Sequence, residues 1–180
     1  MQESRKKRIW LMRILAVSWM IMIFGFSATE GNESSETSHW VGRAIGRVFV
    51  SGFSEMSVEE QNEWADRIDY PIRKAAHASE YAVLAILIFF ALEETFADKG
   101  KYLRYLTSLL LTALYAGSDE FHQLFVPGRA GTLFDVGVDT MGATVGLFIL
   151  WLIRRRILRQ REKKRLLTLK IPGDGGSGCL

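Results

Sequence analysis

Four strongly apolar segments constrain the fold of this 180-residue chain more than any other feature. A helix needs about 20 residues to cross the hydrocarbon core of a membrane. The second and fourth segments approach that length, and the first and third reach it with their flanking residues. The sequence therefore predicts an all-α fold, a bundle of four transmembrane helices. The segments are Trp10–Phe26, Ala75–Leu92, Tyr105–Ala116 and Phe134–Ile153.

The basic residues fall mainly on one side of these segments. Of the 23 lysines and arginines, 17 lie before or within the first segment, between the second and third, or after the fourth. The positive-inside rule assigns that side to the cytoplasm, so we expect both termini to be cytoplasmic. The net charge of +3 then reflects topology, and no nucleic-acid partner is predicted. The first segment is long for the apolar part of a signal peptide, so we expect a retained helix.

Three regions follow from this pattern. Residues 1–8 form a basic cytoplasmic N-terminus, and residues 9–153 form the membrane domain, which includes an outer loop at 27–70. Residues 154–180 form a basic cytoplasmic tail. Its last part, rich in Gly and Ser and holding the lone Cys179, is predicted to be disordered.

The outer loop is predicted to contain short interfacial helices that face outward. Ser27–Ser38 is polar and indicates a loop, whereas Trp40–Phe53 has apolar residues at helical spacing, typical of a helix on the bilayer or the bundle. Ser57 and Glu60 form a capping box that opens a second helix. This helix is expected to end near Asp69, so that the second membrane helix begins at the Tyr70-Pro71 break.

Three of the membrane segments carry ionisable side chains at their predicted outer ends. Such groups are costly in a membrane, so they usually pair, face the bundle interior or serve a function. Helical spacing places them on shared faces, and a Gly-x-x-x-Gly pattern on the fourth segment favours close helix contact. The candidate site residues are Lys74, His77, Glu80, Tyr81, Asp119, Glu120, His122, Gln123, Arg129, Asp135 and Asp139.

Structural roles could also explain these residues one by one. Asp119 and Glu120 could be solvated loop carboxylates, and Asp135 could cap the fourth helix. Asp139 could form a buried ion pair with Arg129 or Lys74. A turn at Pro127-Gly128 is expected to aim Arg129 back toward Asp135. The gathering of so many polar groups on one side favours a shared site.

In their order and spacing, these residues resemble the VanZ-like family of bacterial membrane proteins. The resemblance covers about residues 10–153. After the first segment the family tends to show a Ser-Ser-Gln turn, where this chain has Phe26-Ser27-Ala28-Thr29. The motifs that carry it are Lys74-x-x-His77-x-x-Glu80-Tyr81, Ser118-Asp119-Glu120-x-His122-Gln123, Pro127-Gly128-Arg129 and Asp135-x-x-x-Asp139-x-x-Gly142-x-x-x-Gly146.

The resemblance implies a four-helix protein of the bacterial cytoplasmic membrane. The family is named for an accessory protein linked to low-level resistance to teicoplanin, a lipoglycopeptide antibiotic. Two functions stay open: an enzyme, either a hydrolase or a transferase, acting on the head group of a phosphate-bearing envelope lipid, or a non-catalytic protein that binds a lipid-linked precursor or a lipoglycopeptide. In a third hypothesis the polar cluster only fixes the register of the helices.

In the enzyme hypothesis, His77 and His122 act as acid, base or nucleophile. Asp119, Glu120 and Asp135 orient them or bind a divalent cation, and Glu80 completes the catalytic set. The residues expected to bind substrate are Lys74, Tyr81, Gln123, Arg129 and Asp139, of which the two cations would neutralise phosphate. Beyond that cation, no cofactor or set of metal ligands is predicted.

Overall fold

The chain is helical throughout its described part. The computed structural model describes residues 2–29 and 31–170, and no strand occurs among them. The all-α prediction is therefore confirmed for this part, while the predicted disorder around Cys179 lies outside it. The helices are α1 (Gln2–Ser27), α2 (Gly31–Phe49), the short 3-10 helix η1 (Phe53–Glu55), α3 (Val58–Ala91), α4 (Lys101–Gln123) and α5 (Leu133–Lys170).

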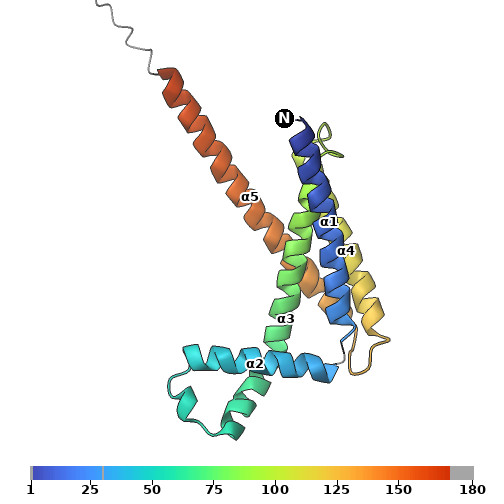
Figure 1. Cartoon of the computed structure of the whole chain (residues 1–180), viewed down its shortest axis with the longest axis vertical. Coiled ribbons are helices and arrows are strands. Elements are labelled where there is room, and N and C mark those ends of the chain that lie inside the picture. Colours follow the sequence, from blue (N-terminus) through green and yellow to red (C-terminus); the bar gives the residue numbers. More distant parts are fainter. Residues whose placement is uncertain (1, 30, 171–180) are drawn as a thin grey trace, which may run out of the picture. The chain divides into compact units, whose positions relative to one another are not determined.

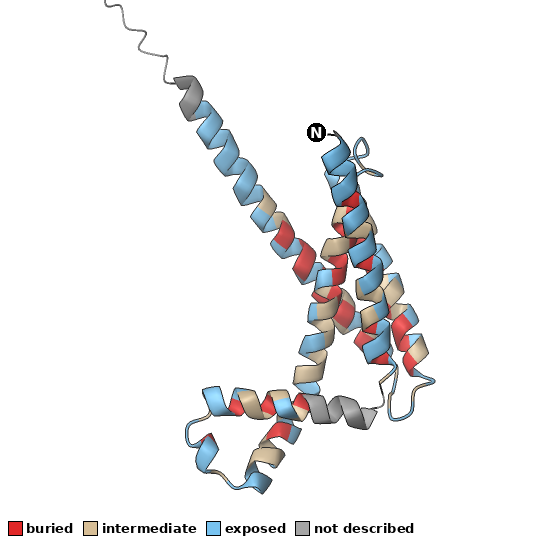
Figure 2. Ribbon diagram, in the orientation of Figure 1, coloured by how far each residue is buried: buried red, intermediate tan, exposed pale blue. Residues whose placement is uncertain are grey.

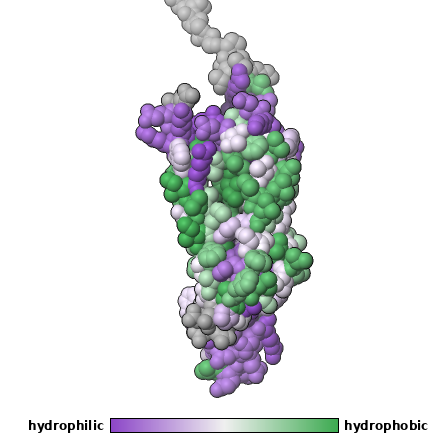
Figure 3. Space-filling view, turned by 90° about the vertical axis from the view of Figure 1, so that its right-hand side faces the viewer, coloured by the Kyte–Doolittle hydropathy of each residue, from purple (hydrophilic) through white to green (hydrophobic). Residues whose placement is uncertain are grey.

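Three of the described helices are long and apolar enough to cross a membrane. The apolar stretches are Glu3–Ser27 in α1, Val58–Ala91 in α3 and Leu133–Leu166 in α5. The third predicted segment, in α4, is not among them. Many large apolar side chains of these helices are exposed, and apolar side chains gather in the middle of the face shown in Figure 3. Exposure on this scale suits a lipid environment better than water.

Two compact units make up the chain, with the boundary inside α5 between Leu147 and Phe148. In the first unit, α1 and α4 pack against α3, and α1 also contacts α4. Figures 1 and 2 show these helices and the buried positions along them. The core consists of small and branched residues with one buried tyrosine: Ala16, Ile23, Tyr81, Leu84, Ile88 and Ala116.

The described part of the second unit, residues 148–170, continues α5 as a basic helix. The Phe148 and Trp151 rings stack with centroids 5.7 Å apart. The Arg155 guanidinium lies 5.2 Å from the Trp151 ring centroid, a distance typical of a cation–π contact. The apolar pattern predicted only the first part of this helix, because an apolar run marks the membrane-embedded length and not the helix end.

The segment predicted to be an outer loop, residues 27–70, differs from its prediction in two places. The polar stretch after α1 is not a loop, because α2 already begins at Gly31 and packs on α3. The predicted break at Pro71 is also wrong, since α3 runs through it without interruption. Proline removes one backbone donor, but Asp69 and Arg73 form an ion pair of 2.9 Å that spans the proline.

The predicted capping box at Ser57 is confirmed, and it opens α3. Ser57 caps α3, since its hydroxyl accepts from the Glu60 N–H at 3.2 Å. The Glu60 carboxylate in turn accepts from the Ser57 N–H at 2.7 Å. This capping box satisfies two backbone donors at the helix start.

Two glycines let α5 approach α3 more closely than any other residue would allow. A Cβ at Gly142 would lie 2.1 Å from the carbonyl oxygen of Ala78, and one at Gly146 would lie 2.8 Å from that of Ala82. The predicted Gly-x-x-x-Gly contact is therefore confirmed, with α3 as the partner helix.

We expect Gly142→Ala to destabilise the protein by about 1–3 kcal/mol, because the methyl group would collide with a backbone carbonyl that can only move with its helix. The free energy of unfolding in detergent measures this. Gly137→Ala is the matched control on the same helix, since a Cβ there meets nothing within 4 Å. Equal effects of the two changes would contradict the close approach.

Candidate functional site

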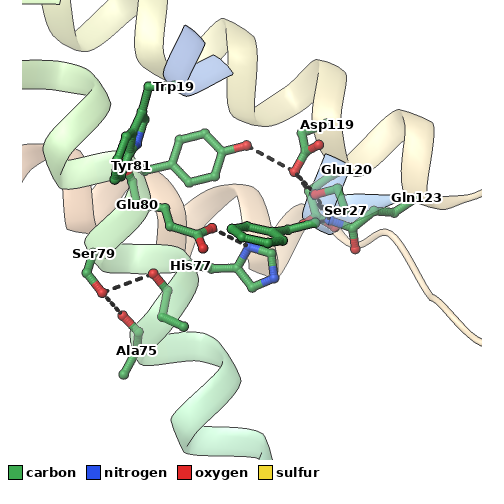
Figure 4. A network of polar contacts seen from close by, with 12 residues as sticks. Trp19, Ser27, Ala75, His77, Ser79, Glu80, Tyr81, Asp119, Glu120 and Gln123 are labelled. Atoms are coloured by element: carbon green, nitrogen blue, oxygen red, sulfur yellow. Dashed lines mark hydrogen bonds and ion pairs between the residues drawn. The ribbon is translucent and has the colours of Figure 1, made fainter. Parts of the chain in front are cut away.

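A buried carboxylate, that of Asp119, joins three helices. Its side chain is 2% exposed. The Oδ2 atom accepts hydrogen bonds from the Ser27 hydroxyl of α1 at 2.6 Å, the Tyr81 hydroxyl of α3 at 3.1 Å and the Gln123 amide of α4 at 3.3 Å. Oδ1 is buried without a hydrogen-bond partner. Figure 4 shows Ser27, Tyr81 and Asp119 in this network.

Glu120 holds the connection between α4 and α5. It is 6% exposed, and it accepts from the Gln123 amide at 3.2 Å and from the Thr132 N–H at 3.0 Å. Gly131 must be glycine, because a Cβ there would lie 2.0 Å from the Glu120 carbonyl oxygen. Neither Asp119 nor Glu120 is the solvated loop carboxylate considered above, since both lie buried in the last turns of α4.

Lys74 and Asp135 form an ion pair between α3 and α5. Asp135 is 8% exposed, whereas Lys74 lies partly open and 5.2 Å from the Tyr70 ring centroid. The helix start is capped by Thr132, whose hydroxyl accepts from the Asp135 N–H at 3.1 Å. The prediction that Arg129 pairs with Asp135 is therefore wrong. Asp135 pairs with Lys74 of α3, whereas Arg129 donates to carbonyl groups at the end of α1.

Arg129 closes the C-terminal end of α1. Its Nε donates to the Thr29 carbonyl at 3.1 Å and its Nη2 to the Phe26 carbonyl at 3.3 Å. A cation is favourable at such carbonyls. Burial lowers the pKa of Arg129, and the positive charge of Arg73 lowers it further. Arginine stays charged in proteins, so two nearby cations repel each other here.

A pocket of about 360 Å³ lies beside these groups. The end of α1, the first half of α2, the middle of α3 and Arg129 from the loop before α5 form its wall. Its wall contains both polar and apolar side chains. The lining residues are Phe26, Thr29, Ser38, Val41, Ile72, Arg73, Ala76, His77, Glu80 and Arg129.

His77 and Glu80 bring an acid–base pair to this pocket. The His77 Nδ1 lies 3.8 Å from a Glu80 carboxylate oxygen, too far for a hydrogen bond, and Nδ1 is buried without a partner. The Glu80 backbone is fixed by the Trp19 indole, which donates to its carbonyl at 2.9 Å. In Figure 4 the two side chains lie next to each other on α3.

The predicted site residues thus fall into separate groups. The pocket holds His77, Glu80 and Arg129, while Tyr81, Asp119 and Gln123 form the buried network and Glu120 holds the loop. Lys74 pairs with Asp135, and neither residue lines the pocket. His122 lies on α4 with its ring centroid 4.2 Å from that of Phe24, and it does not line the pocket. Asp139 is 2% exposed in α5, with Oδ2 unpartnered.

The Asp139 ion pair considered from the sequence is not formed in the structure. Lys74 pairs with Asp135 instead, and Arg129 donates to the carbonyl groups of Phe26 and Thr29. Ser27, Arg73 and Thr132 were missed by the sequence analysis. For Ser27 a signal did exist, since it lies in the stretch after the first apolar segment where the family tends to show a serine-containing turn.

No divalent cation is assigned. Within residues 2–29 and 31–170, no three side chains of His, Cys, Asp or Glu are arranged to hold a metal ion. The three carboxylates predicted to bind a cation have other partners in the protein. Asp119, Glu120 and Asp135 accept hydrogen bonds from a hydroxyl, a backbone N–H and an ammonium group, respectively.

Fold and site together define an integral membrane protein with a buried polar network between its helices. The chain belongs to the VanZ/LLP1 family, whose family model matches residues 12–154. That match spans α1 to the first half of α5 and includes every predicted site residue. No curated protein and no solved structure matches the chain significantly.

We expect Tyr81→Phe to lower the free energy of unfolding by about 1.5–3 kcal/mol, because it removes a donor to a buried carboxylate. Tyr115→Phe is the matched control, since the Tyr115 hydroxyl donates to a neutral acceptor, the Met20 carbonyl, at 2.6 Å. That change should cost about 0.5–1.5 kcal/mol. Unfolding in detergent measures both. A smaller loss for Tyr81→Phe than for its control would show that Asp119 does not hold the helices together.

Proposed function

We propose that this VanZ/LLP1-family protein recognises a phosphate-bearing envelope lipid at the outer face of the bacterial cytoplasmic membrane. One observation carries the proposal: Arg73 and Arg129 share a pocket with the apolar side chains of Phe26, Val41 and Ile72. Guanidinium groups bind phosphate oxygens strongly and in bidentate fashion. The apolar wall suits the glycerol and acyl part of the same molecule.

Electrostatics support an anionic ligand. The charge of Arg73 acts on Arg129, so an anion between them would relieve their repulsion. Arg129 already donates to two neutral carbonyl groups near the end of α1, and Arg73 pairs with Asp69, so both side chains are held in position. A pre-positioned cation loses little entropy on binding its ligand.

The contacts between helix ends support four membrane crossings. Ser27 at the end of α1 meets Asp119 near the end of α4, whereas Glu93, just after α3, pairs with Arg5 and Arg8 at the start of α1. Since α4 begins after α3 and ends beside Ser27, it covers the same thickness as α1. Its lower apolar content follows from buried polar residues such as Thr112.

With four crossings, the positive-inside rule places both termini in the cytoplasm and the pocket at the outer face. There α2 would lie at the membrane surface, because α1 ends at Ser27 and α2 starts at Gly31. The exposed Trp40, Val48 and Phe49 of α2 suit the interfacial region of the outer leaflet.

Chemistry on the bound lipid is the second candidate function. It is favoured by His77, whose buried Nδ1 has no partner and faces Glu80 in the pocket. In an enzyme His77 would take a proton from the attacking water or hydroxyl group, or give one to the leaving oxygen of the phosphoester, and Glu80 would orient the imidazole. Such a protein would be a membrane hydrolase or transferase. A non-catalytic protein would use the same arginines to bind and release the lipid unchanged.

Either function would connect the pocket to glycopeptide resistance. Binding or altering a lipid-linked cell-wall precursor at the outer face would change how a lipoglycopeptide of the teicoplanin type reaches its target. The antibiotic itself, which carries a lipid chain, is the other ligand that a pocket of mixed polarity could take.

We expect Arg129→Gln to weaken the binding of phosphatidylglycerol at least tenfold, since a charge-assisted hydrogen bond contributes about 1.5–3 kcal/mol. Titration of fluorescent phosphatidylglycerol into the purified protein in detergent measures this. Fluorescent diacylglycerol, which lacks phosphate, should bind weakly to both proteins. Arg67→Gln is the matched control, because Arg67 is an exposed arginine of α3 that does not line the pocket.

Arg129 also caps α1, so its loss could act through stability. Ile72→Trp provides a second variant that fills the pocket and leaves every arginine in place, and it should also weaken binding. Unchanged affinity in both variants, or equal affinity for lipids with and without phosphate, would refute the proposed ligand. His77→Ala should leave binding intact, and loss of turnover in this variant would identify an enzyme.

A further inference from the structure

A second polar cluster lies in the bundle, and none of its members is among the residues that line the pocket. Four carboxylates, each at most 8% exposed, gather near one ammonium group. Each buried charge needs a partner of opposite charge or a hydrogen bond, and here the carboxylates outnumber the single ammonium group. The cluster consists of Lys74 on α3, Asp119 and Glu120 on α4, and Asp135 and Asp139 on α5, with the Tyr81 hydroxyl beside it.

Three of the four carboxylates have donors that stabilise a negative charge. Asp119 accepts from two hydroxyl groups and an amide. Glu120 accepts from a backbone N–H and an amide, and Asp135 pairs with Lys74. Each of these donors already has a carboxylate acceptor. Lys74 is the one cation of the cluster, and it pairs with Asp135.

Asp139 is the member left without a donor among the described residues. Its side chain is 2% exposed, and its Oδ2 is buried with no hydrogen-bond partner. One turn further along α5, Gly142 packs directly on the Ala78 backbone of α3. The neighbouring charges of Glu120 and Asp119 are negative, and that of Lys74 is already paired.

From this distribution of donors we propose that Asp139 is a proton-binding site, occupied at neutral pH, inside the α3–α4–α5 contact. An ionised carboxylate there would bear the full desolvation cost of a charge without a donor, whereas the neutral acid bears the smaller cost of an uncharged polar group. A bound metal ion would need several ligands, and within the described ranges no such group exists.

The packing of the helices around Asp139 would therefore depend on whether its carboxyl group holds a proton. Loss of the proton adds a negative charge beside Glu120 and Asp119, at the level where α5 presses on α3. The resulting repulsion would act between α5 and α4, the helix that carries Glu120 and Asp119. This site does not depend on the proposed lipid pocket, since Asp139 is not among the residues that line it.

Dicyclohexylcarbodiimide tests the proposal, because it reacts with protonated carboxyl groups in apolar surroundings. The whole protein in lipid nanodiscs is treated between pH 6 and pH 9, and the modified residues are mapped by peptide mass spectrometry. We expect Asp139 to be labelled at neutral pH and labelling to fall as pH rises. The exposed Asp98 serves as the control carboxylate and should stay unlabelled at neutral pH.

Infrared spectra give an independent readout. The C=O stretch of a protonated carboxylic acid should be present at neutral pH, lose intensity in Asp139→Asn and keep its intensity in Asp98→Asn. Labelling of the unaltered protein keeps the test valid if Asp139→Asn does not fold. Absence of both the label and the acid band would overturn the proposal, and so would protection of Asp139 by sodium ions at constant pH.

Discussion

The hydrogen bonds to Asp119 are the interaction on which the rest of the structure depends. In lipid there is little hydrophobic force between helices, so packing and polar contacts decide how they associate. Asp119 receives one donor from each of α1, α3 and α4. A single carboxylate thereby fixes the register of three helices at their polar ends, where the pocket and the loop to α5 also lie.

The pocket depends on that register. Glu80 and Tyr81 are adjacent on α3, so the bond from Tyr81 to Asp119 also determines where Glu80 and His77 point. The bonds of Arg129 to the last carbonyls of α1 then bring a loop cation to the same place. The site is thus assembled from several helices and a loop, and hydrogen bonds hold α3 and the loop in place, which is the arrangement that keeps a binding geometry rigid.

The sequence was informative wherever a local rule decides the outcome. The capping box at Ser57 and the glycine contact at Gly142 depend on neighbouring residues or on a fixed spacing, and both were predictable. Partner choice was not, because it depends on distances between helices. Asp135 therefore pairs with Lys74 and not with Arg129. Likewise Pro71 signals a break locally, but the packing of α2 on α3 and the Asp69–Arg73 pair keep that helix continuous.

Photocrosslinking in intact bacteria tests the central claim, recognition of a phosphate-bearing lipid, most directly. A benzophenone amino acid at Ile72 would face the pocket, and one at the exposed Leu110 of α4 would sample the surrounding bilayer. Mass spectrometry then identifies the lipids attached at each position. The account predicts that one phosphate-bearing lipid is strongly enriched at Ile72 relative to Leu110, and that Arg129→Gln removes the enrichment. Adducts of the same composition at both positions would contradict it.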